Sequence, residues 1–106
     1  MPESQEWRDV ADVVEFEKKD RKLVDLGDRK QIALFKLADG FFAVSAWCSH
    51  QRMSLMDGDI VDEQIMCPLH GAMFDIRTGE NMTLPAVRPI DSYETKVEGN
   101  RIFIKA

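Results

Sequence analysis

The sequence has no apolar run approaching the roughly 20 residues that a membrane-spanning helix needs. It also has no basic stripe, because 14 lysines and arginines face 19 aspartates and glutamates and the net charge is −5. A nucleic-acid surface would need such a stripe. The first residues, MPESQEWRD, are polar and acidic, unlike a secretory signal. We therefore expect a cytoplasmic protein that contacts neither membrane nor nucleic acid.

The chain also lacks a linker, a low-complexity tract and an internal repeat. Its 106 residues are typical of one domain, and a content of 44% hydrophobic and 31% charged residues is globular rather than disordered. We expect a single domain over residues 1–106 with a modest core. Domains of this size often gain stability from a metal or another cross-link.

Short apolar runs alternate with Gly and Asx turns, which predicts an all-β fold. The expected strands are residues 22–26, 31–37, 41–47, 63–66, 73–77, 91–98 and 101–105. Asp39-Gly40 and Gly99-Asn100 predict tight hairpins, because these residues accept positive φ angles. A short helical turn is expected near Asp9–Val13. The whole pattern favours a small β-sandwich or barrel.

Cysteine and histidine are scarce, with two of each in the chain. All four lie in one segment, as Cys48, His50, Cys67 and His70. The first pair follows the strand expected to end at Trp47, and the second pair follows the strand expected to end at Met66. Each pair should therefore lie on a loop at a strand end, where two side chains can turn toward a common point.

Three interpretations of this pattern remain open. The four residues could be unrelated core cysteines and surface histidines, which is improbable for two Cys-His pairs that use the whole supply. They could form a structural Cys2His2 zinc site. They could also hold a [2Fe-2S] cluster, with both cysteines on one iron and both histidines on the other. Zinc fingers usually group Cys with Cys and His with His, so one of each per loop favours the cluster.

The segments CSH, CPLHG and FDIRTGE, followed by the proline loop LPAVRPI, resemble a Rieske-type ferredoxin. These proteins are soluble carriers of ring-hydroxylating oxygenase systems. The resemblance implies a Rieske-like β-sandwich or barrel with two cluster-binding loops at one tip. It also implies one [2Fe-2S] cluster per chain, with Cys48 and Cys67 on the inner iron and His50 and His70 on the outer iron.

The resemblance further implies a monomer that passes one electron from a flavin-dependent reductase to a terminal Rieske oxygenase. We do not expect an enzyme. A mononuclear iron site would need two more histidines, and no G-x-G-x-x-G motif offers a dinucleotide site. Two alternatives remain. One is a Rieske-like small subunit of a nitrite reductase or diiron monooxygenase, and the other is a zinc-binding domain without a redox role.

The sequence departs from the respiratory members of this family in ways that predict a low potential. Those members have a disulfide-forming cysteine inside each motif, where this chain has Met53 and Leu69. They also have serine and tyrosine hydroxyls that donate to sulfur, where this chain has Ala72 and Phe74. If electrons leave through the histidine ligands, the docking tip should contain Gln51, Arg52, Pro68, Leu69, Gly71 and Pro85.

Two further expectations concern the rest of the chain. The mixed-sign run EFEKKDRK, residues 15–22, is expected to be a solvated strand or turn. Trp7 and Trp47 are expected to be packing residues, because basic residues are not interleaved around them as on a nucleic-acid stacking platform.

Overall fold

The computed structural model describes residues 6–27, 31–47, 54–68, 71–82 and 89–106, and it is all-β as predicted. The strands are β1 (Trp7–Asp12), β2 (Arg21–Asp25), β3 (Gln31–Leu37), β4 (Gly40–Ser45), β5 (Ile60–Val61), β6 (Gln64–Met66), β7 (Met73–Asp75), β8 (Ser92–Tyr93), β9 (Thr95–Glu98) and β10 (Arg101–Lys105). Two short 3-10 helices, η1 (Val13–Phe16) and η2 (Leu55–Asp57), interrupt them. In the described residues, neither helix is long and apolar enough to span a membrane.

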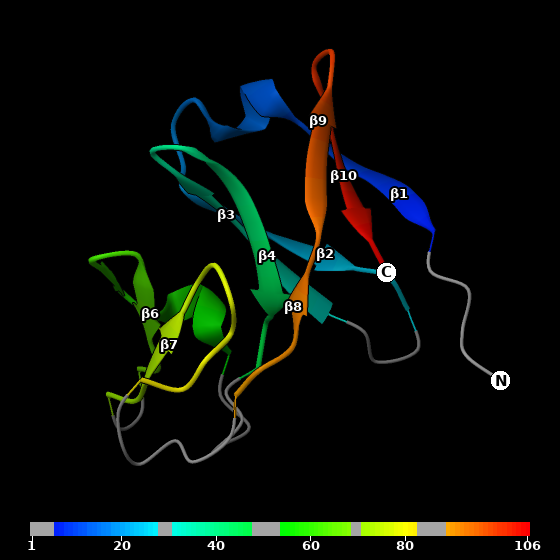
Figure 1. Cartoon of the computed structure of the whole chain (residues 1–106). Coiled ribbons are helices and arrows are strands. Elements are labelled where there is room, and N and C mark those ends of the chain that lie inside the picture. The colour runs from blue at the N-terminus through cyan, green and yellow to red at the C-terminus, as the bar shows by residue number, and fades with distance from the viewer. Residues whose placement is uncertain (1–5, 28–30, 48–53, 69–70, 83–88) are drawn as a thin grey trace, which may run out of the picture.

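The strands form three antiparallel sheets, and the described residues close no barrel (Figure 1). The terminal sheet has the order β1-β10-β9, the central sheet β2-β3-β4-β8, and the small sheet β5-β6-β7. The small sheet lies to one side of the central sheet in Figure 1, and the terminal sheet lies to the other side. The fold therefore consists of layers rather than a closed cylinder.

Strand β3 shows why the central sheet is the middle layer. Its residues Ile32 to Phe35 are all fully buried, although neighbouring side chains on a strand point to opposite faces. Ala33 and Phe35 pack into one hydrophobic cluster together with residues of the small sheet. Ile32 and Leu34 pack into a second cluster with residues of the terminal sheet. A continuous apolar run is the pattern of a strand buried on both faces.

The terminal sheet includes a strand that was not predicted. Strand β1 covers Trp7–Asp12, so the helical turn expected near Asp9–Val13 is wrong. The helix η1 begins directly after β1, because Asp12 caps it and the Glu15 carboxylate accepts the reciprocal hydrogen bond from the Asp12 N–H in a capping box. Glu6 and Ala106 also exchange two backbone hydrogen bonds, of 3.3 and 3.1 Å. The described ends of the chain therefore lie side by side.

Other expected elements are confirmed with small shifts. Leu37 pairs with Gly40 and Glu98 pairs with Arg101, so both predicted two-residue hairpins are present. The strand expected at 91–98 is divided at Glu94 into β8 and β9, which belong to different sheets. The two-residue strand β5 was missed. It joins β6 through a turn in which Asp62 and Glu63 both have positive φ, 50° and 66°.

The expectation for the tryptophans is wrong, and the expectation for the charged run holds at residues 17–20, which are exposed. Trp7 and Trp47 are 38% and 42% exposed, so neither is a buried packing residue. The run 15–22 is solvated only in part. Phe16 is 3% exposed in the core, and the Arg21 side chain is 19% exposed and contacts the small-sheet side of the molecule.

Candidate cluster site

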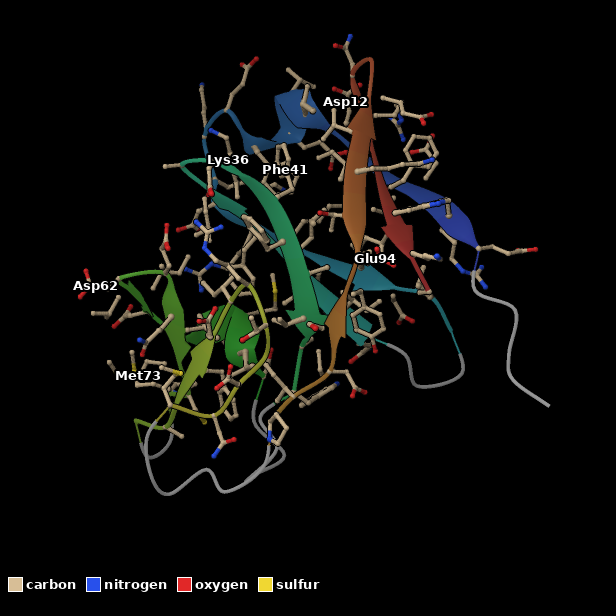
Figure 2. The ribbon with its side chains drawn as sticks, viewed as in Figure 1. Asp12, Lys36, Phe41, Asp62, Met73 and Glu94 are labelled. Carbon is tan, nitrogen blue, oxygen red and sulfur yellow. The ribbon has the colours of Figure 1, made fainter. Side chains whose placement is uncertain are left out.

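The second Cys-His segment lies between the last two strands of the small sheet. Met66 at the end of β6 pairs with Met73 at the start of β7, which lies at the lower left of Figure 2. The Cys67 N–H donates to the Ala72 carbonyl at 2.7 Å, and the Gly71 N–H donates to the Cys67 carbonyl at 3.0 Å. Gly71 has φ of +75°, which glycine adopts without a side-chain clash. The turn is therefore closed tightly around the cysteine.

Cys67 is suited to be a fixed ligand. Its side chain is 1% exposed and forms no disulfide. It packs in the cluster between the small and central sheets, together with Ala72 and Phe74. Both backbone polar groups of Cys67 are bonded within its own turn. A buried thiol on a fixed backbone fits the thiolate ligand that an iron–sulfur cluster needs.

The residues that precede and follow the first Cys-His segment are paired with each other. Trp47 and Ser54 form an antiparallel bridge, and the Leu55 N–H donates to the Ala46 carbonyl at 2.7 Å. The Ser54 hydroxyl then caps η2 by accepting from the Met56 N–H at 3.1 Å. The described residues on either side of residues 48–53 therefore lie next to each other.

The bases of the two loops share one core. Ala46 and Leu55 lie on either side of the first Cys-His segment. Cys67 begins the second segment, and Ala72 follows it. All four residues belong to the same hydrophobic cluster and are at most 1% exposed. Segments about 20 residues apart in sequence thus start from neighbouring positions, which two ligand pairs with a common centre require.

The proline loop is anchored beside the same strand. The Met82 N–H donates to the Met73 carbonyl at 2.7 Å, and the Ile90 N–H donates to the Gly79 carbonyl at 2.8 Å. A Cβ on Gly79 would lie 2.1 Å from the Ile90 carbonyl oxygen, so only glycine permits this approach. Residues 83–88 thus connect two positions on the small-sheet side. The expected covering role of Pro85 lies outside the described residues.

Three of the four predicted ligands also lie outside the described residues: Cys48, His50 and His70. Cys67 alone can be placed. Within the described ranges, no group of three His, Cys, Asp or Glu side chains is arranged to hold a metal ion. Of the expected docking tip, Pro68 is exposed and Gly71 is half-buried, while Gln51, Arg52, Leu69 and Pro85 are not described.

Two arginines tie the small sheet to the central sheet, a role that was not predicted for either of them. The first, Arg21, donates through Nη1 to the Met56 carbonyl at 3.1 Å and to the Gly58 carbonyl. Its guanidinium carbon lies 5.5 Å from the centre of the Phe35 ring, and its Nε donates to Asp20 at 2.8 Å. This bond to Arg21 lowers the pKa of the Asp20 carboxyl.

The second arginine, Arg77, follows β7. Its Nη2 donates to Asp39 at 2.7 Å, in the β3–β4 turn, and to Glu63 at 2.9 Å, in the β5–β6 turn. Hydrogen bonding from Arg77 lowers the pKa of both carboxyls. The same two bonds raise the pKa of the guanidinium above its ordinary value. Three turns from two sheets are thereby joined by one side chain.

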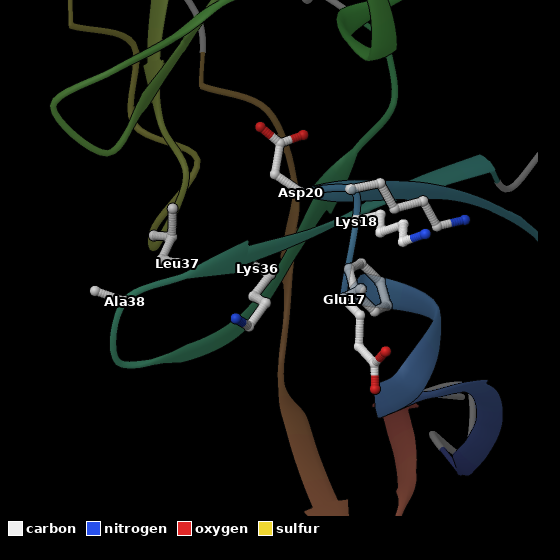
Figure 3. A pocket seen from close by; sticks show the side chains of 8 residues that line it. Glu17, Lys18, Asp20, Lys36, Leu37 and Ala38 are labelled. Carbon is white, nitrogen blue, oxygen red and sulfur yellow. The ribbon is translucent and has the colours of Figure 1, made fainter.

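A separate open pocket lies at the other end of β4 from the first ligand loop (Figure 3). It is lined by residues 16–20, between η1 and β2, and by Lys36, Leu37 and Ala38 at the β3–β4 turn. Its charged side chains are surface lysines, a glutamate and an aspartate. The first Cys-His segment follows the opposite end of β4, and Cys67 does not line the pocket, so the pocket is not part of the candidate cluster site.

Comparison with known proteins places this geometry in a family. A model of the Rieske [2Fe-2S] domain matches residues 6–94. The 3-phenylpropionate/cinnamic acid dioxygenase ferredoxin subunit of Shigella flexneri serotype 5b is 38% identical over 96 residues, or 90% of this chain and 86% of that protein. The chain belongs to the Rieske [2Fe-2S] domain family.

Solved Rieske structures have the same fold. The ferredoxin of carbazole 1,9a-dioxygenase from Nocardioides aromaticivorans IC177 has a TM-score of 0.84 and 31% identity, over 92% of this chain and 95% of that one. The Sphingomonas yanoikuyae B1 ferredoxin has a TM-score of 0.86 and 25% identity, over 95% and 99% of the two chains. The likeness spans all three sheets and is not confined to the ligand motifs.

Membership of the Rieske family decides several of the predictions. The cofactor is one [2Fe-2S] cluster, so the zinc alternative does not hold. The named relatives are ferredoxins, and the expectation of a Rieske-type electron carrier rather than an enzyme is confirmed. Ala72 and Phe74, which replace the hydroxyl donors of respiratory members, are 1% and 0% exposed. They surround Cys67 with carbon rather than with donors.

Proposed function

We propose that this Rieske protein carries one electron at a time from a flavin-dependent reductase to a terminal ring-hydroxylating oxygenase. Cys48 and Cys67 would bind one iron of the cluster, and His50 and His70 the other. The cluster supplies the one-electron chemistry, and the chain supplies a fixed, largely dry setting. The observation that carries this proposal is the buried Cys67, which shares one hydrophobic cluster with Ala46 and Leu55 on either side of the first Cys-His segment.

The choice of partners is supported by the relatives. The 3-phenylpropionate/cinnamic acid dioxygenase relative is a ferredoxin subunit, and this chain covers 86% of its length. The ferredoxin from Nocardioides aromaticivorans IC177 serves a carbazole dioxygenase. These systems share a design in which a small carrier shuttles between two larger proteins. We propose the same shuttle role for this chain, as a monomer.

The charge distribution supports docking through the small-sheet side. Residues 54–82 contain six carboxylates and one arginine, a net charge of −5, while the other thirteen acidic and thirteen basic residues of the chain cancel. Asp57, Asp59, Asp62 and Glu63 are all exposed in this segment, and Asp62 projects outward from the β5–β6 turn (Figure 2). Partners with a basic docking site would be attracted to the half of the molecule that carries the second ligand loop.

The ligand assignment is tested by cluster analysis of single variants. The wild-type protein, purified without oxygen, should contain two irons and two acid-labile sulfides per chain, as the cluster formula requires. His50→Ala, His70→Ala and Cys67→Ala should each lose the cluster or alter its electron paramagnetic resonance spectrum. Pro68→Ala is the matched control, because Pro68 is exposed in the same turn and carries no ligand atom. Full iron content in any of the three ligand variants would remove that residue from the set.

The shuttle role is tested with a purified flavin-dependent reductase and a purified ring-hydroxylating oxygenase. The reduced protein should transfer its electron to the oxygenase and support more than one turnover of product for each carrier molecule. Isolation of the chain only as a fixed stoichiometric complex with a catalytic subunit would instead favour the nitrite reductase or diiron monooxygenase alternative.

A further inference from the structure

Arg21 is the one charged side chain in the described residues whose hydrogen bonds reach across to η2 and the turn after it. It starts β2 in the central sheet, and its Cα is the register partner of Phe35 on β3. Its guanidinium lies over the Phe35 ring, and Phe35 is fully buried in the cluster that contains Cys67. From there Nη1 donates to the carbonyls of Met56 and Gly58. Cations often satisfy the last carbonyls of a helix in this way.

The turn that Arg21 holds is the end of the first ligand loop. The helix η2 starts at Leu55, directly after the bridge between Trp47 and Ser54 that closes residues 48–53. Leu55 is itself bonded to Ala46 on the other side of that loop. A shift of η2 would therefore move the point at which the first ligand loop returns to the fold.

The same turn also touches the strand that leads into the second ligand loop. Gly58 is so close to Met66 that a Cβ would lie 2.0 Å from the Met66 carbonyl oxygen. The Met66 N–H donates to the Asp59 carbonyl at 2.9 Å, and Met66 directly precedes Cys67. The Gly58 turn thus contacts Arg21 and also contacts the backbone of Met66, the residue before the buried Cys67.

We propose that Arg21 is a positioning residue that sets the two cluster-ligand loops relative to each other, acting through the η2–Gly58 turn. This inference rests on the ligand assignment proposed above. The role is geometric rather than electrostatic, because Asp20 accepts from both Nε and Nη2 of Arg21 and balances its charge. A planar guanidinium can satisfy Asp20 and two carbonyls at once, and a lysine ammonium cannot match that geometry.

The test compares two Arg21 variants with a matched control in the cluster-loaded protein. Arg21→Gln removes the charge, and Arg21→Lys keeps the charge but not the planar group. Arg101→Gln is the control, because Arg101 forms ion pairs with Asp9 and Asp12 on the terminal sheet, in a different layer. The readouts are the spectrum of the reduced cluster by electron paramagnetic resonance, the midpoint potential, and hydrogen exchange of the Leu55 and Met66 amides.

Both Arg21 variants should broaden the spectrum, shift the midpoint potential, and raise exchange at Leu55 and Met66 about fivefold or more, the factor expected for one lost interaction. The Arg101 control should change none of these. Wild-type spectra, potential and exchange in Arg21→Lys would overturn the geometric role, even if Arg21→Gln were too unstable to load. A lower unfolding temperature alone would show an ordinary structural contact and would also overturn it. Absence of a cluster in the wild-type protein would instead refute the proposed function.

Discussion

The guanidinium carbon of Arg77 lies 4.6 Å from the centre of the Phe42 ring, and the two residues come from different sheets. Phe42 belongs to β4 in the central sheet, while Arg77 follows β7 in the small sheet. The ring and the carboxylates of Asp39 and Glu63 hold the arginine on three sides. The small sheet is thereby attached to the central sheet through β4, while Arg21 makes its own attachment from β2, two strands away at the same register level.

Replacing Arg77 with methionine should lower stability more than the same change at Arg101. An isolated surface ion pair contributes little, but Arg77 also stacks on a ring and joins turns of two sheets. Denaturant unfolding of Arg77→Met and Arg101→Met measures the difference. Equal losses would mean that the contact with Phe42 adds nothing to an ordinary surface pair.

Stability should fall in acid, and Arg77 should account for part of the fall. Hydrogen bonds from Arg77 hold the pKa of Asp39 and Glu63 below their unfolded values, which are near 4. A lowered pKa in the folded state stabilises the protein above the unfolded pKa, and this contribution is lost as the pH falls through the folded pKa. The free energy of unfolding should therefore decrease below about pH 4.

The matching variant separates this effect from the other carboxylates of the chain. Arg77→Met should show a shallower acid decline than the wild-type protein, because Asp39 and Glu63 then titrate near their ordinary values in both states. Urea unfolding between neutral pH and pH 3 gives both curves. Identical slopes in the acid limb would assign the decline to other groups, such as Asp20 beside Arg21.

Gly58→Ala should destabilise the fold and reduce cluster loading. Gly58 has an ordinary φ of −82°, so the expected cost is purely steric and arises from the Met66 carbonyl. Overpacking of this kind costs about 1–3 kcal/mol, and here the closest group is the backbone carbonyl of Met66, with the Ile65 side chain 3.3 Å away. Gly27→Ala is the control, since Gly27 has φ of +80° but open space around it. Its backbone strain should cost about 1–2 kcal/mol without loss of iron.

The midpoint potential should lie near the negative end of the roughly −150 to +300 mV spanned by Rieske centres. Ala72→Ser should raise it, because the Ala72 carbonyl already accepts from the Cys67 N–H and a hydroxyl at this position adds a donor beside the cysteine. Ala33→Ser is a matched control in the same buried cluster on β3, and it should leave the potential unchanged. A wild-type value above about +100 mV would show that another feature dominates.

Reversing one charge on the small sheet should slow electron delivery at low salt. Asp59 is exposed there, and Asp59→Lys weakens the local negative field that would attract a basic partner. Stopped-flow transfer to the oxygenase should be several-fold slower at low ionic strength. The difference should nearly vanish at about 0.5 M salt, where screening is strong. Glu17→Lys makes the same charge change beside η1 and should have little effect. Equal slowing by both variants would indicate only overall charge.

Strands with a clear apolar pattern could be predicted from the sequence, and strands without one could not. Strand β3 is a run of apolar residues bounded by turns, so its limits at Gln31 and Leu37 were correct. Strand β1 buries only Ala11, so it carries no alternating pattern. The Asp12 and Glu15 capping box would have moved the expected helical turn to its observed place.

Candidate ligands could be proposed from the sequence because rare residues mark them, whereas the contacts of the common residues around Cys67 could not be predicted. Cys67 was singled out because cysteine is scarce in this chain. Arg21 lies in a charged run, and its three-way contact depends on a turn 35 residues or more away. The function of such a side chain follows from tertiary contacts, for which a single sequence has no local signal.

The ladder between β1 and β10 brings Glu6 and Ala106 together, on a sheet separated from the ligand loops by the central sheet. This arrangement makes the fold tolerant of circular permutation. A short linker joining these ends, with a new opening in the exposed Gly99-Asn100 turn, would keep every strand of the central and small sheets intact. The same geometry suits fusion to another domain, since an attached partner would extend from the terminal sheet, which packs on the other side of the central sheet from Cys67.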